Sequence, residues 1–217
     1  MLCAASFAVH ASFLTGCTTD AYDKGDGEYS LMQAEMADVH VDGSLKADFF
    51  VTDDGERLAV TNTFTAGWMK TADSTYRAVA YFNRSGTGAE VVAMNHVATL
   101  RPWAVKDRKT DPVRFESAWM SASGRYLNTA IYVLLGSTDN EKAIQTIGCH
   151  RDTLRRNSDG TRTQLLTLLH DQGGVPQYYS QRAYISIALD SIQADSVCLS
   201  INTYDGVVRK TMRTVRH

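Results

Sequence analysis

Apolar and polar residues alternate along most of the chain from Tyr29 onward, and this period of two limits the fold more than any other feature. Ile185, Ile187 and Leu189 would share one face of a strand, with Ser186 on the opposite face. Long amphipathic helical patterns are absent, and turn residues bound the apolar runs. A chain of 217 residues, 44% of them hydrophobic, can bury the core of one large β domain or two small ones. We therefore expect an all-β fold.

The first half contains two strand–turn–strand units. In the stretch ADFFVTDDGERLAVT, Asp54 and Gly55 are the residue types that most readily adopt a positive φ in a tight turn, and apolar runs flank them. The stretch TYRAVAYFNRSGTGAEVVAMNHVATL is the second unit, with Gly86 and Gly88 in its loop. Both units predict hairpins of a small β domain.

The composition changes at residues 102–112, where Pro102 and Pro112, two of the chain's three prolines, flank a cluster of charged residues. Proline and charge together are typical of a connection between domains. We interpret this stretch as a linker between a β domain at residues 30–101 and a second domain at residues 113–217.

Strand patterns are clearest in the second domain, where Val197, Leu199 and Ile201 alternate with Cys198. Five further stretches have the same character: VRFESAWM, YLNTAIYVLL, TQLLTLLH, AYISIALD and VRKTMRTV. DQGGVPQYYSQR reads as a long turn between two of them, and TDNEKAIQ as a short helix. About seven strands in a domain of this size predict an antiparallel β-sandwich.

Residues 2–14 are apolar, but they are fewer than the roughly 20 residues that a membrane-spanning helix needs. A small-residue motif and a cysteine end this run: Leu14, Thr15, Gly16 and Cys17. The order of an aliphatic residue, two small residues and a cysteine resembles the bacterial lipobox. We expect residues 1–17 to be a lipoprotein signal peptide with Cys17 as the lipid attachment point, although the segment lacks the usual opening Lys or Arg. An ordinary cleaved signal and a buried thiol are the alternatives.

Residues 18–29 are polar and acidic, which is typical of a flexible tether. Two or more acyl chains on Cys17 would give lasting membrane attachment, at about 0.8 kcal/mol per buried methylene. The sequence thus predicts a cell-envelope protein held in a membrane through acylated Cys17. We expect the outer membrane, on its periplasmic face or at the cell surface.

Two cysteines remain for the folded domains once Cys3 leaves with the signal peptide and Cys17 is acylated. They are Cys149 and Cys198, in a compartment where disulfides form. Pairing depends on a Cα separation below about 7 Å, which the sequence does not reveal. A disulfide and two buried free thiols are both open at this point.

Several stretches resemble one known family. LKADFFVTDDGERLAV and VVAMNHVATLRPWAV look like the N-terminal OB-like domain of the NigD-like lipoproteins of Bacteroidetes. DPVRFESAWMSASGRYLNTAIYVLLG and YISIALDSIQADSVCLSINTYDG are similar to the C-terminal β-sandwich domain of that family. The resemblance implies a small OB-like barrel followed by an antiparallel β-sandwich. The loop after Phe82 is too short for the helix that many OB barrels insert, which allows a partly open or reduced barrel.

The same resemblance implies a secreted, lipid-anchored envelope protein whose family takes its name from a bacteriocin-associated locus. It supplies no catalytic residues. The sequence also lacks HExxH, GxSxG and a glycine-rich phosphate loop, and its six histidines are scattered singly. VTDDGE lacks the spacing of a calcium loop, and a net charge of −2 gives no reason to expect nucleic acid binding. We expect no metal, no cofactor and no enzymatic activity.

Loop aromatics are the candidate contact surfaces. Trp68 lies in an irregular connection of the kind that stacks sugars or nucleotides beside OB barrels, although packing within the loop explains it as well. Tyr178 and Tyr179 form a second candidate, because paired tyrosines on a loop favour interfaces. We therefore predict a non-catalytic module that binds a protein or a glycan. The alternatives are a component of a bacteriocin production or self-protection locus and an unrecognised glycan-processing hydrolase.

Overall fold

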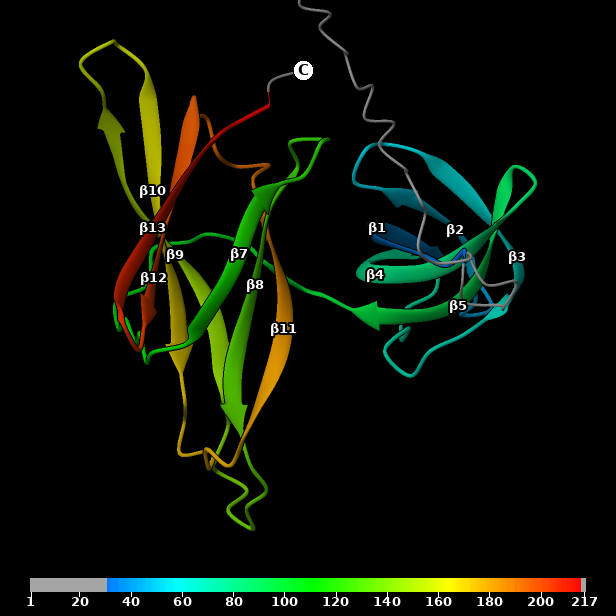
Figure 1. Cartoon of the computed structure of the whole chain (residues 1–217), viewed down its shortest axis with the longest axis horizontal. Coiled ribbons are helices and arrows are strands. Elements are labelled where there is room, and N and C mark those ends of the chain that lie inside the picture. The colour runs from blue at the N-terminus through cyan, green and yellow to red at the C-terminus, as the bar shows by residue number, and fades with distance from the viewer. Residues whose placement is uncertain (1–30, 216–217) are drawn as a thin grey trace, which may run out of the picture. The chain divides into compact units, whose positions relative to one another are not determined.

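The computed structural model describes residues 31–215, so residues 14–17 and the expected tether at 18–29 lie outside the described part of the chain. From Met32 onward the chain forms one compact unit. All regular secondary structure in residues 31–215 is β-strand (Figure 1). This part contains no helix long and apolar enough to cross a membrane. The expected all-β class is confirmed.

The first five strands form a closed barrel. They are β1 (Gln33–Val41), β2 (Ala47–Thr52), β3 (Arg57–Phe64), β4 (Ser74–Ser85) and β5 (Gly88–His96). The order around the barrel is β1-β2-β3-β5-β4, and β4 pairs with β1 to close it. The OB-like barrel is therefore complete rather than partly open.

A glycine permits the closure between β3 and β5. These strands pair in parallel over two positions, with Ala59 opposite Gly88. A Cβ on Gly88 would lie 2.7 Å from the Ala59 carbonyl oxygen, so only glycine lets the two backbones approach this closely. Gly86, with a φ of 58°, makes the turn from β4 to β5. The two glycines expected in one loop thus have different roles.

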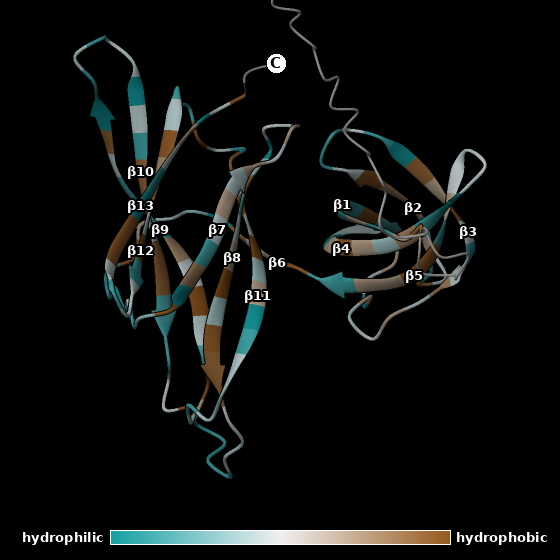
Figure 2. Ribbon diagram, in the orientation of Figure 1, coloured by the Kyte–Doolittle hydropathy of each residue, from teal (hydrophilic) through white to brown (hydrophobic). Residues whose placement is uncertain are grey.

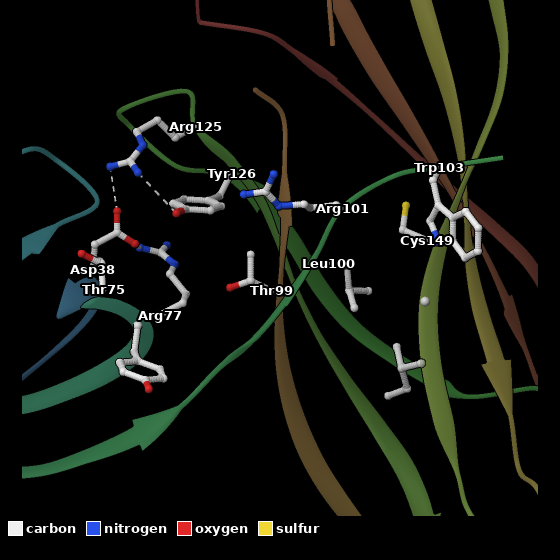
Figure 3. A pocket seen from close by; sticks show the side chains of 13 residues that line it. Asp38, Thr75, Arg77, Thr99, Leu100, Arg101, Trp103, Arg125, Tyr126 and Cys149 are labelled. Carbon is white, nitrogen blue, oxygen red and sulfur yellow. Dashed lines mark hydrogen bonds and ion pairs between the residues drawn. The ribbon is translucent and has the colours of Figure 1, made fainter. Parts of the chain in front are cut away.

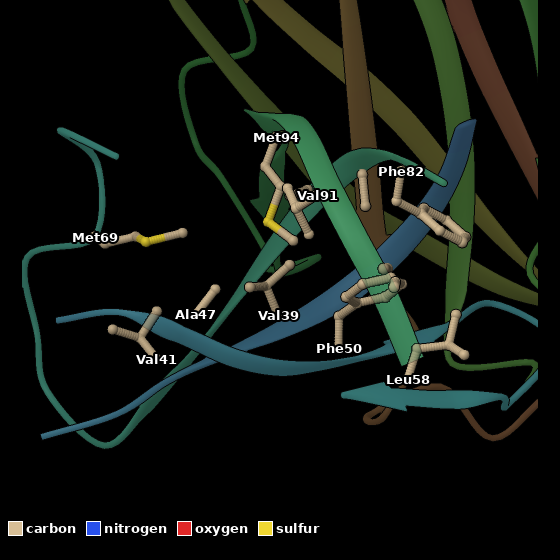
Figure 4. Packing of buried hydrophobic residues seen from close by; sticks show 13 residues of the cluster. Val39, Val41, Ala47, Phe50, Leu58, Met69, Phe82, Val91 and Met94 are labelled. Atoms are coloured by element: carbon tan, nitrogen blue, oxygen red, sulfur yellow. The ribbon is translucent and has the colours of Figure 1, made fainter. Parts of the chain in front are cut away.

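The barrel interior is filled by side chains that alternate along its strands. Phe50 of β2 and Phe82 of β4 pack edge to face with ring centroids 5.0 Å apart (Figure 4). Val39 of β1 and Leu58 of β3 join the same buried cluster. Burial of side chains of this size contributes roughly 1.5–3 kcal/mol each, so this cluster stabilises the barrel.

The hairpin predicted around Asp54 and Gly55 is confirmed, because β2 and β3 pair antiparallel. Its loop is longer than a two-residue turn. Only Gly55, with a φ of 93°, adopts the left-handed conformation. The Thr52 N–H donates to the Glu56 carbonyl at 2.9 Å, and the Thr52 hydroxyl also bonds the Asp54 carboxylate. The loop therefore caps itself through its threonine.

The remaining strands form a β-sandwich, as expected. They are β6 (Ala98–Leu100), β7 (Arg114–Met120), β8 (Tyr126–Leu135), β9 (Thr146–Arg156), β10 (Arg162–Asp171), β11 (Tyr179–Ala188), β12 (Ser196–Thr203) and β13 (Gly206–Arg213). One sheet has the order β13-β12-β10-β9 and the other β6-β11-β8-β7. Brown, hydrophobic segments recur along these strands in Figure 2, and Ile187, Leu199 and Leu166 are fully buried between the sheets. Most neighbours are antiparallel, but β10 with β12 and β11 with β6 are parallel.

Some elements differ from the sequence-based expectations. The expected short helix at residues 138–145 is wrong, because this stretch has no regular secondary structure apart from a turn at 141–142. β9 was not among the predicted strands, because its second half, with Arg155 and Arg156, is exposed and lacks the apolar alternation. The long turn is shorter than expected, since β11 already begins at Tyr179.

Residues 101–113, here called the strap, pair with strands of the sandwich. The stretch that the sequence indicated as a linker is therefore bound to the second domain. The strap forms single parallel bridges to three strands: Trp103 with His150, Thr110 with His170 and Val113 with Thr203. β6, which directly precedes the strap, pairs with β11 in the sandwich. The expected boundary at residue 101 therefore assigns to the barrel a strand that belongs to a sandwich sheet.

Candidate functional site

Arg77 of β4 is a buried arginine whose side chain is only 2% exposed. Its neighbours in the sequence, Ala78 and Val79, lie in an apolar run, so the strand pattern predicts a hydrophobic environment at this point. Burying an unpaired charge costs several kcal/mol. The guanidinium must therefore be matched by partners from other elements, and these partners define the site.

Two of the partners are carboxylates of the barrel. The Arg77 Nη2 donates to Asp53 Oδ1 at 2.5 Å, and the Nη1 donates to Asp38 Oδ1 at 3.4 Å. Asp53 follows β2 and Asp38 lies in β1. Together they provide two negative charges for one buried positive charge.

The other partners come from the sandwich. Arg77 Nε donates to the Ser186 hydroxyl of β11 at 3.1 Å, and this hydroxyl donates to Asn128 Oδ1 of β8 at 2.7 Å. Asn128 Nδ2 donates in turn to Asp53 Oδ2 at 2.8 Å. The Arg77 guanidinium also lies over the Tyr126 ring, 4.2 Å from its centroid. We call Arg77, Asp53, Asn128 and Ser186 the arginine clamp, because it ties barrel strands to sandwich strands.

Apolar side chains support the arginine clamp. Met36, Val79 and Val97 form a small buried cluster, against which Trp119 of β7 and Tyr184 of β11 pack. These residues lie outside the two main cores. The cluster excludes water beside the charged network, and low local polarity strengthens the hydrogen bonds there.

A groove of about 650 Å³ opens beside the arginine clamp (Figure 3). It is lined from the barrel by Asp38, Thr75, Tyr76 and Arg77, from β6 and the strap by Thr99, Leu100, Arg101 and Trp103, from the β7–β8 turn by Arg125 and Tyr126, and from β9 by Ile147, Gly148 and Cys149. Its volume lies within the range of small-ligand sites.

Two exposed guanidiniums dominate the charge of the groove. The side chain of Arg101 is 82% exposed, and its nearest carboxylate, that of Asp190, lies at 3.9 Å. The side chain of Arg125 is 59% exposed and contacts Asp38 Oδ2 at 2.7 Å. Trp103 is 65% exposed and presents an aromatic surface in the same groove. Arginine and tryptophan are, with tyrosine, the residues that most often dominate binding energy at interfaces.

Two potentially reactive side chains of the groove, those of Cys149 and Asp38, are buried or ion-paired. Burial raises the pKa of the Cys149 thiol to about 12, and the charge of Asp152 acts in the same direction. Asp38, the carboxylate of the groove, is engaged by both Arg77 and Arg125. Burial also raises the pKa of Tyr126. In residues 31–215 no group of His, Cys, Asp and Glu side chains could hold a metal ion. The arrangement suits binding of anionic or planar groups.

The aromatic residues predicted as contact surfaces are not brought together. Trp68 is partly buried against the barrel core, with its ring 5.5 Å from Tyr76 and 5.5 Å from His96. Tyr178 and Tyr179 are exposed where the chain enters β11. The Trp68 ring therefore packs against neighbouring side chains, whereas the two tyrosines are exposed to solvent. Neither set lines the groove.

Sequence reasoning missed the arginine clamp and Trp103. Arg77 directly precedes the apolar run 78–82 of β4, and Ser186 lies on the face of β11 opposite Ile185 and Ile187 yet is fully buried. A charged residue next to an apolar run in a strand is a usable signal for a buried ion pair. Trp103 stands in the charged proline segment that was interpreted as a linker, where its role depends on tertiary contacts.

Cys149 and Cys198 are free thiols, and both are buried. Cys149 lies in β9 and Cys198 in β12, and β10 separates these strands. Two strand spacings of about 4.8 Å each exceed the separation that a disulfide tolerates. Of the two possibilities that the sequence left open, the structure has the unpaired thiols.

Tyr76 provides a titration test of the barrel end. Hydrogen bonds from the Thr71 side chain and from the backbone N–H groups of Lys70 and Thr71 favour the phenolate and lower the pKa of Tyr76 from 10.0 to about 8. The unfolded chain thus binds this proton more tightly than the folded chain does. The free energy of unfolding therefore rises as the pH increases from about 8 to 10. This stabilisation by Tyr76 is lost when the pH falls through about 8. We expect one tyrosine to ionise near pH 8 in an ultraviolet titration.

The Tyr76→Phe variant should lack this early phase and leave the other phases in place. Ionisation of every tyrosine at or above pH 10 in the folded wild-type protein would contradict the hydrogen-bonding arrangement described for Tyr76.

Comparison with known proteins bears on both halves of the chain. A family model for the NigD-like C-terminal beta sandwich domain matches residues 97–214. No curated protein sequence matches the chain. A solved structure of a NigD-like immunity protein from Bacteroides caccae is similar with a TM-score of 0.61 and 20% identity, over 82% of this chain and 91% of that one.

Two further solved structures share the fold. A candidate toxin-related protein from Parabacteroides distasonis has a TM-score of 0.61 and 18% identity, over 84% of this chain and 92% of that one. A candidate lipoprotein from Bacteroides fragilis has a TM-score of 0.59 and 12% identity, over 83% of this chain and 96% of that one. At these identities the likeness shows the fold alone. The matches cover most of the barrel and the sandwich together.

Proposed function

The chain belongs to the NigD-like family, and from this premise we propose that it is a lipid-anchored cell-envelope protein that binds a partner without catalysing a reaction. The partner is a protein or a glycan. The observation that carries the proposal is the groove, where two exposed guanidiniums and an exposed tryptophan surround an open volume of about 650 Å³. Such side chains contribute to recognition more than to bond breaking.

The state of the acidic groups supports binding over hydrolysis. A glycan-processing hydrolase needs two carboxyl groups roughly 5–10 Å apart and free to act as acid, base or nucleophile. The carboxylates beside the groove, Asp38 and Asp53, both accept from Arg77. These carboxylate oxygens are occupied by the guanidinium, so they are not free to contact a substrate. We therefore favour a binding function over that of an unrecognised glycan-processing hydrolase.

Attachment through acylated Cys17 supports the envelope location. Cys17 lies outside the described residues, so the proposal rests on the lipobox-like order of residues 14–17 and on the acidic segment after it. One structural relative is a candidate lipoprotein. We place the chain at the outer membrane, with the acidic segment as the tether between membrane and barrel.

A second candidate function is a role in a bacteriocin production or self-protection locus. It is supported by the names of two structural relatives, an immunity protein and a candidate toxin-related protein. Genes for a bacteriocin or its transporter beside this gene would favour this role, and glycan-utilisation genes would favour a glycan partner. Both roles use a binding surface, so both are compatible with the groove.

Affinity purification tests the groove as the binding surface. The tagged full chain is isolated from envelope extracts of its native bacterium, and bound material is quantified. The Arg101→Glu and Trp103→Ala double variant should retain about tenfold less bound partner, or less still, because side chains of these types dominate binding energy. A matched double variant, Tyr178→Ala and Tyr179→Ala, should retain it. Loss of the partner from the tyrosine variant alone would move the site to that loop.

A further inference from the structure

We infer that the groove accepts an extended, acidic polypeptide segment, which adds as a strand to the outer edge of β9. This inference rests on the proposed function and names the chemistry of the partner. The acceptor is the first half of β9, residues 146–149, and the neighbouring charges come from Arg101 and Arg125.

The groove lies between two sheet edges. β9 is the terminal strand of one sheet and β6 is the terminal strand of the other. Residues of both strands line the groove: Thr99 and Leu100 of β6, and Ile147, Gly148 and Cys149 of β9. A terminal strand presents one row of backbone N–H and C=O groups that its own sheet does not use. An extended chain in the groove can reach such groups.

The hydrogen bonds of Trp103 identify which groups of β9 face outward. The Trp103 N–H donates to the Cys149 carbonyl at 3.3 Å, and the Arg151 N–H donates to the Trp103 carbonyl at 3.0 Å. Because backbone direction alternates with period two along a strand, the Ile147 N–H and C=O and the Cys149 N–H point to this same outer edge. Among the described residues, no hydrogen bond beyond the ladder with β10 involves these three groups.

The strap already shows that the outer edge of β9 accepts a parallel strand. Trp103 forms a one-residue parallel bridge there, opposite His150. The bridge ends at Cys149, and the edge continues through Ile147 along the groove. A peptide bound to the Ile147 N–H and C=O would extend this pairing. Strand addition of this kind draws affinity from main-chain hydrogen bonds and specificity from flanking side chains.

The charges select an acidic segment. Arg101 has a carboxylate no nearer than 3.9 Å and is largely exposed, and Arg125 shares Asp38 with Arg77. A carboxylate on the incoming segment would give either guanidinium a charge-assisted hydrogen bond. Trp103 adds an exposed ring beside the same edge. A glycan could contact these side chains, but it lacks amide groups at strand spacing, so the backbone edge favours a polypeptide.

The test uses random linear peptides displayed on phage, selected on the immobilised full chain. Enriched sequences are synthesised, and their dissociation constants are measured with wild-type protein. We expect peptides that contain Asp or Glu. N-methylation of alternate peptide residues should weaken binding about tenfold in one register, because it removes a main-chain hydrogen bond, and should have little effect in the other register.

Protein variants complete the test. Ile147→Pro removes one outward N–H at a position where an edge strand tolerates proline, and it should weaken binding about tenfold. Arg101→Glu should also weaken binding, whereas Arg156→Glu, the same charge reversal on the exposed end of β9, should not. Thermal unfolding of each variant verifies that it is folded.

The outcomes separate this inference from the proposed function. Peptides that require Arg101 but ignore N-methylation and Ile147→Pro would overturn strand addition and leave the groove as a binding site. Peptides that bind independently of Arg101, Trp103 and Ile147, or the absence of any enriched peptide, would overturn the inference. The proposed function would still be upheld in both cases if the groove variants lose the native partner in the affinity purification.

Discussion

Replacing Arg77 with methionine should lower the free energy of unfolding by about 3–5 kcal/mol. The side chain is 2% exposed, and its removal leaves the partly buried carboxylate of Asp53 beside Asn128 without its cation. The Ser186 hydroxyl also loses the donor of Arg77 Nε. Methionine fills similar volume, so most of the loss comes from the unpaired polar groups. Urea unfolding of the full chain, followed by circular dichroism, measures the change.

Arg84→Met is the matched control. Arg84 lies in the same strand, β4, and forms a two-pronged ion pair with Glu56, but both side chains are substantially exposed. Exposed pairs contribute little to stability, so the urea midpoint of this variant should remain near that of the wild type. Equal destabilisation by the two substitutions would show that burial of Arg77 has no special energetic role.

The second large effect is expected at the N-terminus. Cys17→Ala should abolish incorporation of a labelled fatty acid and should release the protein from the membrane fraction. Acyl chains supply about 0.8 kcal/mol per buried methylene, and no other lasting anchor is proposed for the chain. Metabolic labelling in the native bacterium, followed by fractionation, measures both effects.

Cys198→Ala provides the control for this experiment, because it removes a thiol that lies buried in β12. This variant should be labelled and membrane-bound like the wild type. Equal labelling of Cys17→Ala and wild-type protein would exclude Cys17 as the attachment point.

The sequence was sufficient for the elements whose residues act locally. Gly55 and Gly86 mark real turns because positive φ is a local property, and the alternation in 185–189 and 197–201 locates core faces because side-chain direction is a local property as well. These patterns, with the family resemblance, were enough to predict an OB-like barrel and a sandwich.

Elements that depend on distant partners were not predictable in the same way. β9 carries Arg155 and Arg156 on its exposed half and gains its strand conformation from pairing with β10. The parallel pairs between β10 and β12 and between β11 and β6 depend on chain topology, which alternation does not encode. Strap residues such as Trp103 look like a linker because their bridges are single and widely spaced.

The candidate site shows the same division. Tyr178 and Tyr179 were noticed because exposed aromatic pairs are conspicuous in a sequence, and they are indeed exposed. The groove could not be predicted in this way. Arg101 and Arg125, which line it, are separated along the chain and come together only through the folding of β6 and of the β7–β8 turn. Ser186 appeared as an ordinary outward-facing serine, although it is a member of the arginine clamp.

The central claim is that a partner lies against the groove in the living cell. A photo-crosslinking amino acid placed at position 103, with the same group at position 178 as the control, tests it directly, since both native side chains are exposed aromatics. We expect a discrete crosslinked product from position 103 that Arg101→Glu suppresses, and none from position 178. A product from position 178 with none from position 103 would contradict it.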